Sequence, residues 1–114
     1  MKDIALDICQ GSTFKRVITI SDENGDAVDL SGRTFRGQIR KNFGDFPLVG
    51  EFDFNIEDQI VDKGKVTMIL PASELTSLVL TEKVCYRYDV EMVNLSEVTR
   101  ILQGTANIYP EITK

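Results

Sequence analysis

The chain has 114 residues, of which 42% are apolar and 27% are charged, a composition typical of a folded globular protein and not of a disordered one. Its formal net charge is -5 and its basic residues are scattered, which argues against nucleic acid as a partner. Histidine, the usual general base and the commonest transition-metal ligand, does not occur in the sequence.

Two strands are predicted at the start of the chain. In residues 4–8, aliphatic residues alternate with smaller or charged ones, as in a half-buried strand, and a Gln-Gly-Ser turn follows at residues 10–12. Residues 13–20 predict a second strand with one apolar face. Arg16 is the misfit on that face.

An acidic turn comes after the second strand. Asn24-Gly25 tolerates positive φ and so suits a tight hairpin turn, from which residues 27–30 are expected to run back. The alternating oxygen donors of Asp22, Asn24 and Asp26 also allow a calcium loop. We prefer the plain turn, because the glycine is misplaced for a calcium loop and the closing glutamate is absent.

Residues 34–41 predict a strand with two unlike faces. Its outer face is basic and rich in hydrogen-bonding groups, and it carries Arg36, Gln38 and Arg40. Gly37 falls on the inward face, where the missing side chain leaves room for a bulky neighbour. This outer row is the first candidate for contact with a partner.

Three further elements are predicted next. Residues 48–56 and residues 65–70 each alternate apolar and polar residues and predict two strands, the second of which ends at Pro71. Residues 72–78 form the only helical candidate, because two leucines three positions apart face one way and the preceding proline presets φ. We expect one or two helical turns at most.

A hairpin over residues 84–108 is expected to be the spine of the fold. Its first strand alternates apolar residues with charged ones, and the four residues Asn-Leu-Ser-Glu form the turn. The second strand is less regular, so a bulge or face switch is expected near Gly104. Residues 110–114 then leave as an extended tail.

Strands at this spacing, joined by Gly and Asn turns, predict an all-β fold. We expect an antiparallel two-sheet sandwich, immunoglobulin-like or related, with one short helical turn, and a small barrel is the alternative. No linker or repeat interrupts residues 1–114. A single domain with a short extended C-terminal tail, residues 110–114, is therefore expected.

The N-terminal residues and the lack of a long apolar run favour folding in a cytoplasm. Cys9 and Cys85 match no metal-ligand spacing, and we expect two buried or half-buried thiols, with a disulfide as the alternative. Residues 1–10 lack the pattern of a secretory signal, and no apolar run is long enough to span a bilayer. No membrane partner is expected.

Paired carboxylates are the main candidates for catalysis. Asp89 and Glu91 share one strand face, but an exposed pair two residues apart is more often a solvated surface than a glycosidase site. They are placed to pair with Arg36, Gln38 and Arg40 if the two strands are neighbours. No glycine-rich phosphate loop occurs. We therefore expect no enzyme activity, no cofactor and no metal.

Several sequence blocks stand in a distinctive order: Q-G-S-T-F, N-G-D-A-V-D-L-S-G-R-T-F-R-G-Q-I-R, G-K-V-T-M-I-L-P-A-S-E-L, Y-R-Y-D-V-E and V-T-R-I-L-Q-G-T-A-N-I-Y-P-E-I-T. In this order the chain resembles small β-rich virion proteins of tailed bacteriophages, including cyanophages, and is similar to the adaptor domains that begin some upper-baseplate and tail-fibre proteins. The resemblance covers nearly the whole chain. It implies an immunoglobulin-like or related sandwich and a non-enzymatic structural role.

The resemblance implies an adaptor or assembly component of the tail, baseplate or fibre-attachment region. Such a protein would be oligomeric or present in many copies, would contact other virion proteins, and would be assembled into the virion in the host cytoplasm. A capsid decoration protein is the alternative. A carbohydrate-binding module is a second one, although the chain has no Trp and offers only Tyr109 and Phe43 or Phe46 as surface rings.

Open strand edges give a further expectation about assembly. A small sandwich leaves such edges, so residues 1–10 and the C-terminal tail are expected to be free to add to a neighbour's sheet. The candidate partner-binding residues are Arg36, Gln38, Arg40, Arg100, Gln103, Tyr109, Pro110 and Ile112.

Overall fold

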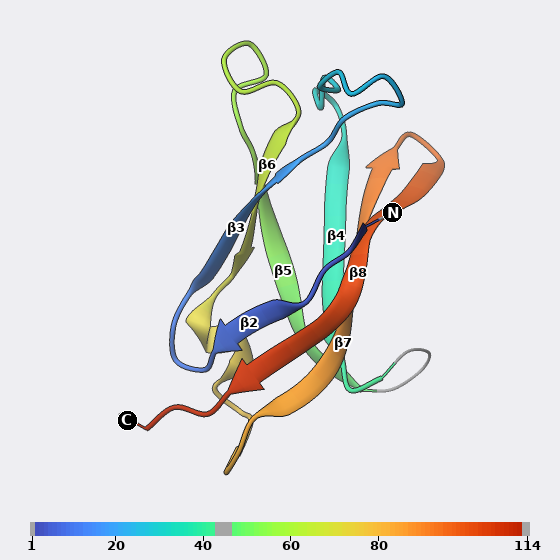
Figure 1. The fold of residues 1–114 in the computed structure, drawn as a ribbon. Helices are drawn as coiled ribbons and strands as arrows, with labels where there is room; N and C mark the ends of the chain where they lie inside the picture. Colours follow the sequence, from blue (N-terminus) through green and yellow to red (C-terminus); the bar gives the residue numbers. More distant parts are fainter. Residues whose placement is uncertain (1, 43–46, 113–114) are drawn as a thin grey trace.

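The computed structural model describes residues 2–42 and 47–112 (Figure 1). Within them the strands are β1 (Lys2–Asp3), β2 (Leu6–Cys9), β3 (Phe14–Thr19), β4 (Thr34–Arg40), β5 (Leu48–Ile56), β6 (Lys65–Leu70), β7 (Val84–Asn94) and β8 (Glu97–Tyr109), and one 3-10 helix, η1, spans Ala72–Leu75. The prediction of an all-β fold with one short helical turn is confirmed. The helix η1 ends at Leu75, three residues before the end of the predicted helical segment, residues 72–78.

The sheet curls over itself at β5. The strands pair in the order β1-β8-β7-β4-β5-β6-β3. β2 also pairs with β8, on the same side as β1 but nearer the C-terminal end of β8. Residues 48–52 of β5 pair with β4, and residues 53–56 pair with β6. One strand is thereby shared between two parts of the sheet. Figure 1 shows β3 and β6 on one side of the molecule, and β8, β7 and β4 on the other.

The β7–β8 hairpin has the form predicted from its alternating pattern, with pairing from Val84 and Ile108 up to the turn. The turn contains Leu95, whose φ is 58°, an uncommon value for a leucine. The register shifts between Val90 and Glu91, which leaves Ile101 without an opposite residue. The bulge predicted near Gly104 therefore lies earlier in β8.

The N-terminal strands run parallel to β8. Leu6 pairs with Ala106 and Ile8 with Ile108, while β1 pairs with β8 further back along the strand. Two expectations are corrected: the sheet is mixed and not purely antiparallel, and residues 2–9 are paired within their own chain and not a free arm. Side chains alternate alike in parallel and antiparallel strands, so the sequence pattern does not separate the two.

Gly104 allows the chain between β1 and β2 to lie against β8. Its φ is 152°, and a Cβ atom at this position would collide with the carbonyl oxygen of Ile4. The N–H of Ile4 donates to the carbonyl oxygen of Gln103 at 2.9 Å, which fixes this close approach. The glycine that suggested a bulge serves a backbone contact instead.

The inward side chains of both parts of the sheet form one apolar core. Gly37 belongs to its wall: a Cβ atom there would lie 3.1 Å from the rings of Phe52 and Phe54, so the expectation that this glycine admits bulky neighbours is confirmed. The buried members of the core are Leu6, Ile8, Ile39, Phe52, Met68, Leu70, Leu75, Tyr88, Val90, Leu102, Ala106 and Ile108. These residues hold β2, β7 and β8 against β5 and β6.

The acidic turn after β3 is closed by its own first residue. Oδ1 of Asp22 accepts hydrogen bonds from the backbone N–H groups of Asn24 and Asp26, at 2.9 and 3.0 Å. Gly25 has φ 85°, as the predicted Asn-Gly turn requires. The returning residues 27–30 make an isolated bridge and not a strand.

Candidate partner-binding surfaces

Charged and amide side chains line up across the outer face of β4, β7 and β8. The two strands are neighbours, and the register places Arg36 opposite Glu91 and Gln38 opposite Asp89, as expected for that case, while Arg40 lies opposite Arg87 and not opposite a carboxylate. β8 continues the rows from the other side of β7. We call this face the polar ladder, and it comprises Arg36, Gln38, Arg40, Arg87, Asp89, Glu91, Arg100 and Gln103.

Ion pairs hold the polar ladder together at the solvent boundary. Nε of Arg36 lies 2.9 Å from Oε1 of Glu91, and Nε of Arg100 lies 3.5 Å from Oδ2 of Asp89. Exposed pairs of this kind are each worth at most about 1 kcal/mol, so they organise the surface more than they stabilise the fold. Each of these two carboxylates thus has an arginine beside it.

Asp89 is a partly buried carboxylate of the polar ladder. Burial raises the pKa of Asp89 above its ordinary value, and Arg100 opposes that effect without cancelling it. Two hollows of about 260 Å³ each adjoin this carboxylate, one lined in part by Arg40 and the other by Arg36. Gln38 borders both hollows, and its Nε2 donates to the carboxylate of Glu51 at 3.1 Å.

The other three candidate residues lie towards the end of β8 and beyond it. Tyr109 closes the strand, and its hydroxyl donates to Oδ1 of Asp7 at 3.2 Å. Pro110 and Ile112 follow the last strand, and Ile112 is 97% exposed. Five of the predicted partner-binding residues therefore meet on the polar ladder, while these three do not. Phe43, Phe46 and residues 113–114 lie outside the described residues.

The two cysteines are exposed and free. Cys9 pairs with Tyr109 on one side of β8, and Cys85 pairs with Asn107 on the other. The expectation of buried or half-buried thiols is wrong, because both residues fall on the outward side of their strands. The intervening strand also keeps them from forming a disulfide.

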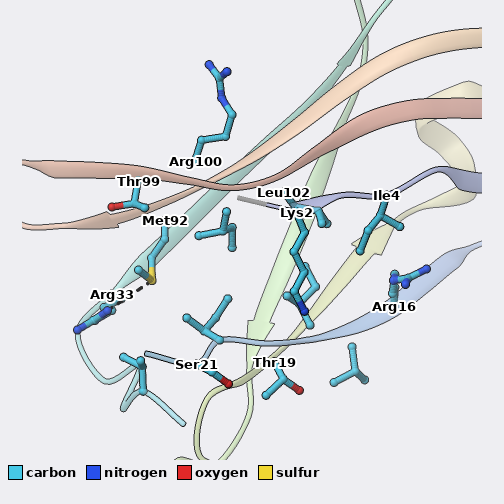
Figure 2. Close-up of a pocket in the computed structure, with 15 residues that line it drawn as sticks. Lys2, Ile4, Arg16, Thr19, Ser21, Arg33, Met92, Thr99, Arg100 and Leu102 are labelled. Atoms are coloured by element: carbon cyan, nitrogen blue, oxygen red, sulfur yellow. Dashed lines mark hydrogen bonds between the residues drawn. The ribbon is translucent and has the colours of Figure 1, made fainter. Parts of the chain in front are cut away.

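A cleft between β3 and the β1–β8 side of the sheet was not predicted from the sequence. Its volume is about 500 Å³. Apolar side chains, among them Ile18 and Leu102, form its floor, and Figure 2 shows the cationic residues around it. We call it the basic cleft. Its lining is formed by Lys2, Ile4, Arg16, Val17, Ile18, Thr19, Ile20, Ser21, Val28, Arg33, Met92, Thr99, Arg100, Ile101 and Leu102.

Four cationic residues line the basic cleft, and Lys2, Arg16 and Arg33 are the three whose charges are not taken up by an ion pair in the described residues. In Figure 2, Lys2 extends towards β3, which carries Arg16, while Arg100 points away from the cleft. Nη1 of Arg33 lies 3.6 Å from the sulfur of Met92. No carboxylate lines the cleft, and within residues 2–42 and 47–112 the three cations make no ion pair. The misfit of Arg16 on an apolar strand face was the one sequence signal for this site.

The described part of the chain contains no group of three or more carboxylate, cysteine or histidine side chains placed to hold a metal ion. Nor does any helix in it have the length and apolar character needed to cross a membrane. No protein-family model matches the chain, and no curated protein matches it.

Proposed function

We propose that this chain is a non-enzymatic structural component of a tailed-phage virion and acts as an adaptor in the tail, baseplate or fibre-attachment region. The order of the sequence blocks supports the phage origin by analogy. The adaptor role has a separate, physical basis in the distribution of exposed apolar side chains. It implies contacts with other virion proteins and more than one copy per particle.

The observation that carries the adaptor role is that aliphatic side chains are exposed at both ends of an elongated body. The molecule measures 44 × 29 × 22 Å. In Figure 1 the β5–β6 loop and the β7–β8 turn lie at one end, and the C-terminal segment lies at the other. Ile60 and Leu95, on the first two segments, are each 94% exposed, and Ile112 is 97% exposed. An adaptor needs contact residues at two separated places.

The β5–β6 loop holds its apolar tip in a fixed position. Oε1 of Gln59 accepts hydrogen bonds from the N–H groups of Leu30 and Gly64, both at 2.9 Å. Oδ1 of Asp58 accepts the N–H of Ile60 at 2.9 Å. A loop held in this way loses little conformational entropy when a partner covers it, which favours assembly.

We take the curled sheet to be a variant of the antiparallel two-sheet sandwich, immunoglobulin-like or related, in which β5 belongs to both layers. The division of β5 between β4 and β6 and the core enclosed by the curl support this description. The parallel pairing of β1 and β2 with β8 is the departure from a purely antiparallel sandwich.

Immunogold labelling of intact virions with an antibody against this chain tests the proposal. The expected result is label on the tail, baseplate or fibre attachment. Label confined to the capsid would reject the adaptor and favour the alternative of a decoration protein. Complete absence of label from purified virions, with the chain present in infected cells, would reject both.

A further inference from the structure

We propose that the basic cleft binds an extended, acidic segment of a partner polypeptide, which pairs with the free edge of β3. This inference deepens the proposed function, because it specifies the chemistry of one neighbour. Only the identity of that neighbour as a virion protein rests on the proposed function. The binding itself follows from the strand edge, the charge of the lining and the apolar floor.

The backbone of β3 offers an unused edge on the side of the cleft. β3 pairs with β6 and, within the described ranges, with no other strand. The N–H of Ile20 donates to the carbonyl oxygen of Gly64 at 2.7 Å, so every second residue back from Ile20 also directs its backbone groups towards β6. The backbone groups of Lys15, Val17 and Thr19 therefore face the other way. An added strand would pair with them.

The lining selects for negative charge. Lys2, Arg16 and Arg33 bring three positive charges to a cleft without a carboxylate, whereas the chain as a whole has a net charge of -5. A local excess of one sign in a protein of the other sign attracts a complementary partner and orients it on approach. Apolar floor residues such as Ile18 and Ile101 provide contacts for alternate side chains of the bound segment.

A polypeptide fits these observations better than an anionic amphiphile does. An amphiphile would use the charge and the apolar floor but would leave the backbone groups of Val17 and Thr19 without partners. The cleft lies along β3, since Arg16 and the next five residues line it. A strand placed there uses all three features at once.

The test uses a labelled octapeptide of alternating aspartate and valine, with binding to the full chain followed by fluorescence anisotropy. A lysine–valine octapeptide is the matched control ligand. The aspartate–valine peptide is expected to bind and the lysine–valine peptide not to bind. Equal binding of both, or no binding of either, would overturn the proposal, whatever the virion labelling shows.

Four variants locate the binding site. Lys2→Glu combined with Arg16→Glu is expected to weaken binding of the acidic peptide about tenfold or more, since two attractive charges become repulsive. Lys15→Glu reverses one charge on the opposite face of β3 and is expected to have little effect, whereas Arg16→Glu alone, its matched single variant, is expected to weaken binding. Equal losses in the two single variants would indicate general charge attraction and overturn the proposal. Thermal unfolding verifies that each variant is folded.

Val17→Pro removes one N–H from the free edge without removing a bond to β6, a substitution that edge strands tolerate. We expect Val17→Pro to weaken peptide binding clearly. If this variant does not fold, the combined Lys2→Glu and Arg16→Glu variant still tests the proposal. Decanoate serves as the amphiphile probe. If decanoate displaces the peptide and a folded Val17→Pro protein binds the peptide normally, the cleft is an amphiphile site and the polypeptide proposal is wrong.

Discussion

The hydroxyl of Tyr88 donates a hydrogen bond of 2.6 Å to the carbonyl oxygen of Ile4. Tyr88 belongs to β7 and is 2% exposed, while Ile4 lies between β1 and β2. The bond therefore joins the N-terminal strands to the central hairpin from inside the core. Burial raises the pKa of Tyr88 to about 12, because the ionised phenolate would lose its hydration there.

Replacing Tyr88 by Phe is expected to lower the free energy of unfolding by about 1–2 kcal/mol, because the Ile4 carbonyl loses its buried donor while the ring is kept. Urea denaturation measures the change. Tyr86→Phe is the matched control on the same strand, since Tyr86 is only partly buried. An equal loss in both variants would show that the Tyr88 bond has no special part in holding the N-terminus.

The raised pKa of Tyr88 also leads us to expect that the free energy of unfolding falls at alkaline pH. Its pKa is about 12 in the folded chain and 10.0 when unperturbed, so the folded state holds the proton more tightly. This contribution is fully present below pH 10.0 and is lost as the pH rises towards about 12. Urea denaturation across this range should show a steeper decline for the natural chain than for Tyr88→Phe. Parallel declines would contradict the assignment.

Much of the pairing follows from the sequence because alternation reports which side of a strand is buried. Alternation placed Arg36 and Gln38 on one outward row and Asp89 and Glu91 on another, able to pair if the strands were neighbours, and the structure makes them neighbours. The alternating pattern is blind to strand direction, however. The parallel pairing of β1 and β2 with β8 depends on contacts between the two ends of the chain, which no local pattern encodes.

The basic cleft could not be predicted from the sequence, because it too depends on contacts between distant parts of the chain. Arg16 stood out as a charge on an apolar face, but Lys2 and Arg33 have no local feature that connects them with it. They meet only because the sheet curls at β5 and leaves a gap between β3 and β8. The sequence shows that Arg100 and Ile101 break the alternation of apolar and polar residues. We nevertheless predicted the bulge near Gly104, because glycine is common at bulges, and the register shift lies at Ile101 instead.

Gly104→Ala is expected to lower the free energy of unfolding by about 2–3 kcal/mol, because the added Cβ atom meets the Ile4 carbonyl and the positive φ is strained. Gly32→Ala is the control. Gly32 has φ 76° but nothing within 4 Å of a Cβ atom, so it is expected to cost about 1 kcal/mol. Equal losses in urea denaturation would show that the close approach of Ile4 is unimportant.

Asp89→Asn is expected to make the folded chain more stable at neutral pH. The pKa of Asp89 is raised above 3.8, chiefly by burial, so its ionised form is disfavoured in the folded state. Protonated Asp89 contributes to the free energy of unfolding below pH 3.8, and this contribution is lost as the pH rises through the pKa of the folded state. The gain from asparagine should therefore vanish in acid. A less stable variant at neutral pH would mean that the ion pair with Arg100 outweighs burial.

The apolar tip of the β5–β6 loop provides the sharpest test of the adaptor role. Ile60 and Val61 are 94% and 78% exposed, so changing both to Ser is expected to alter the free energy of unfolding by no more than about 0.5 kcal/mol. Incorporation into virions, measured by quantitative immunoblotting of purified particles, is nevertheless expected to fall strongly. Lys63→Ser, at an exposed position in the same loop, is the control and should incorporate normally. Because the double variant keeps the fold and the polar ladder, its loss from particles would reflect a contact made by the loop. Normal incorporation would show that this end of the molecule does not contact a virion neighbour.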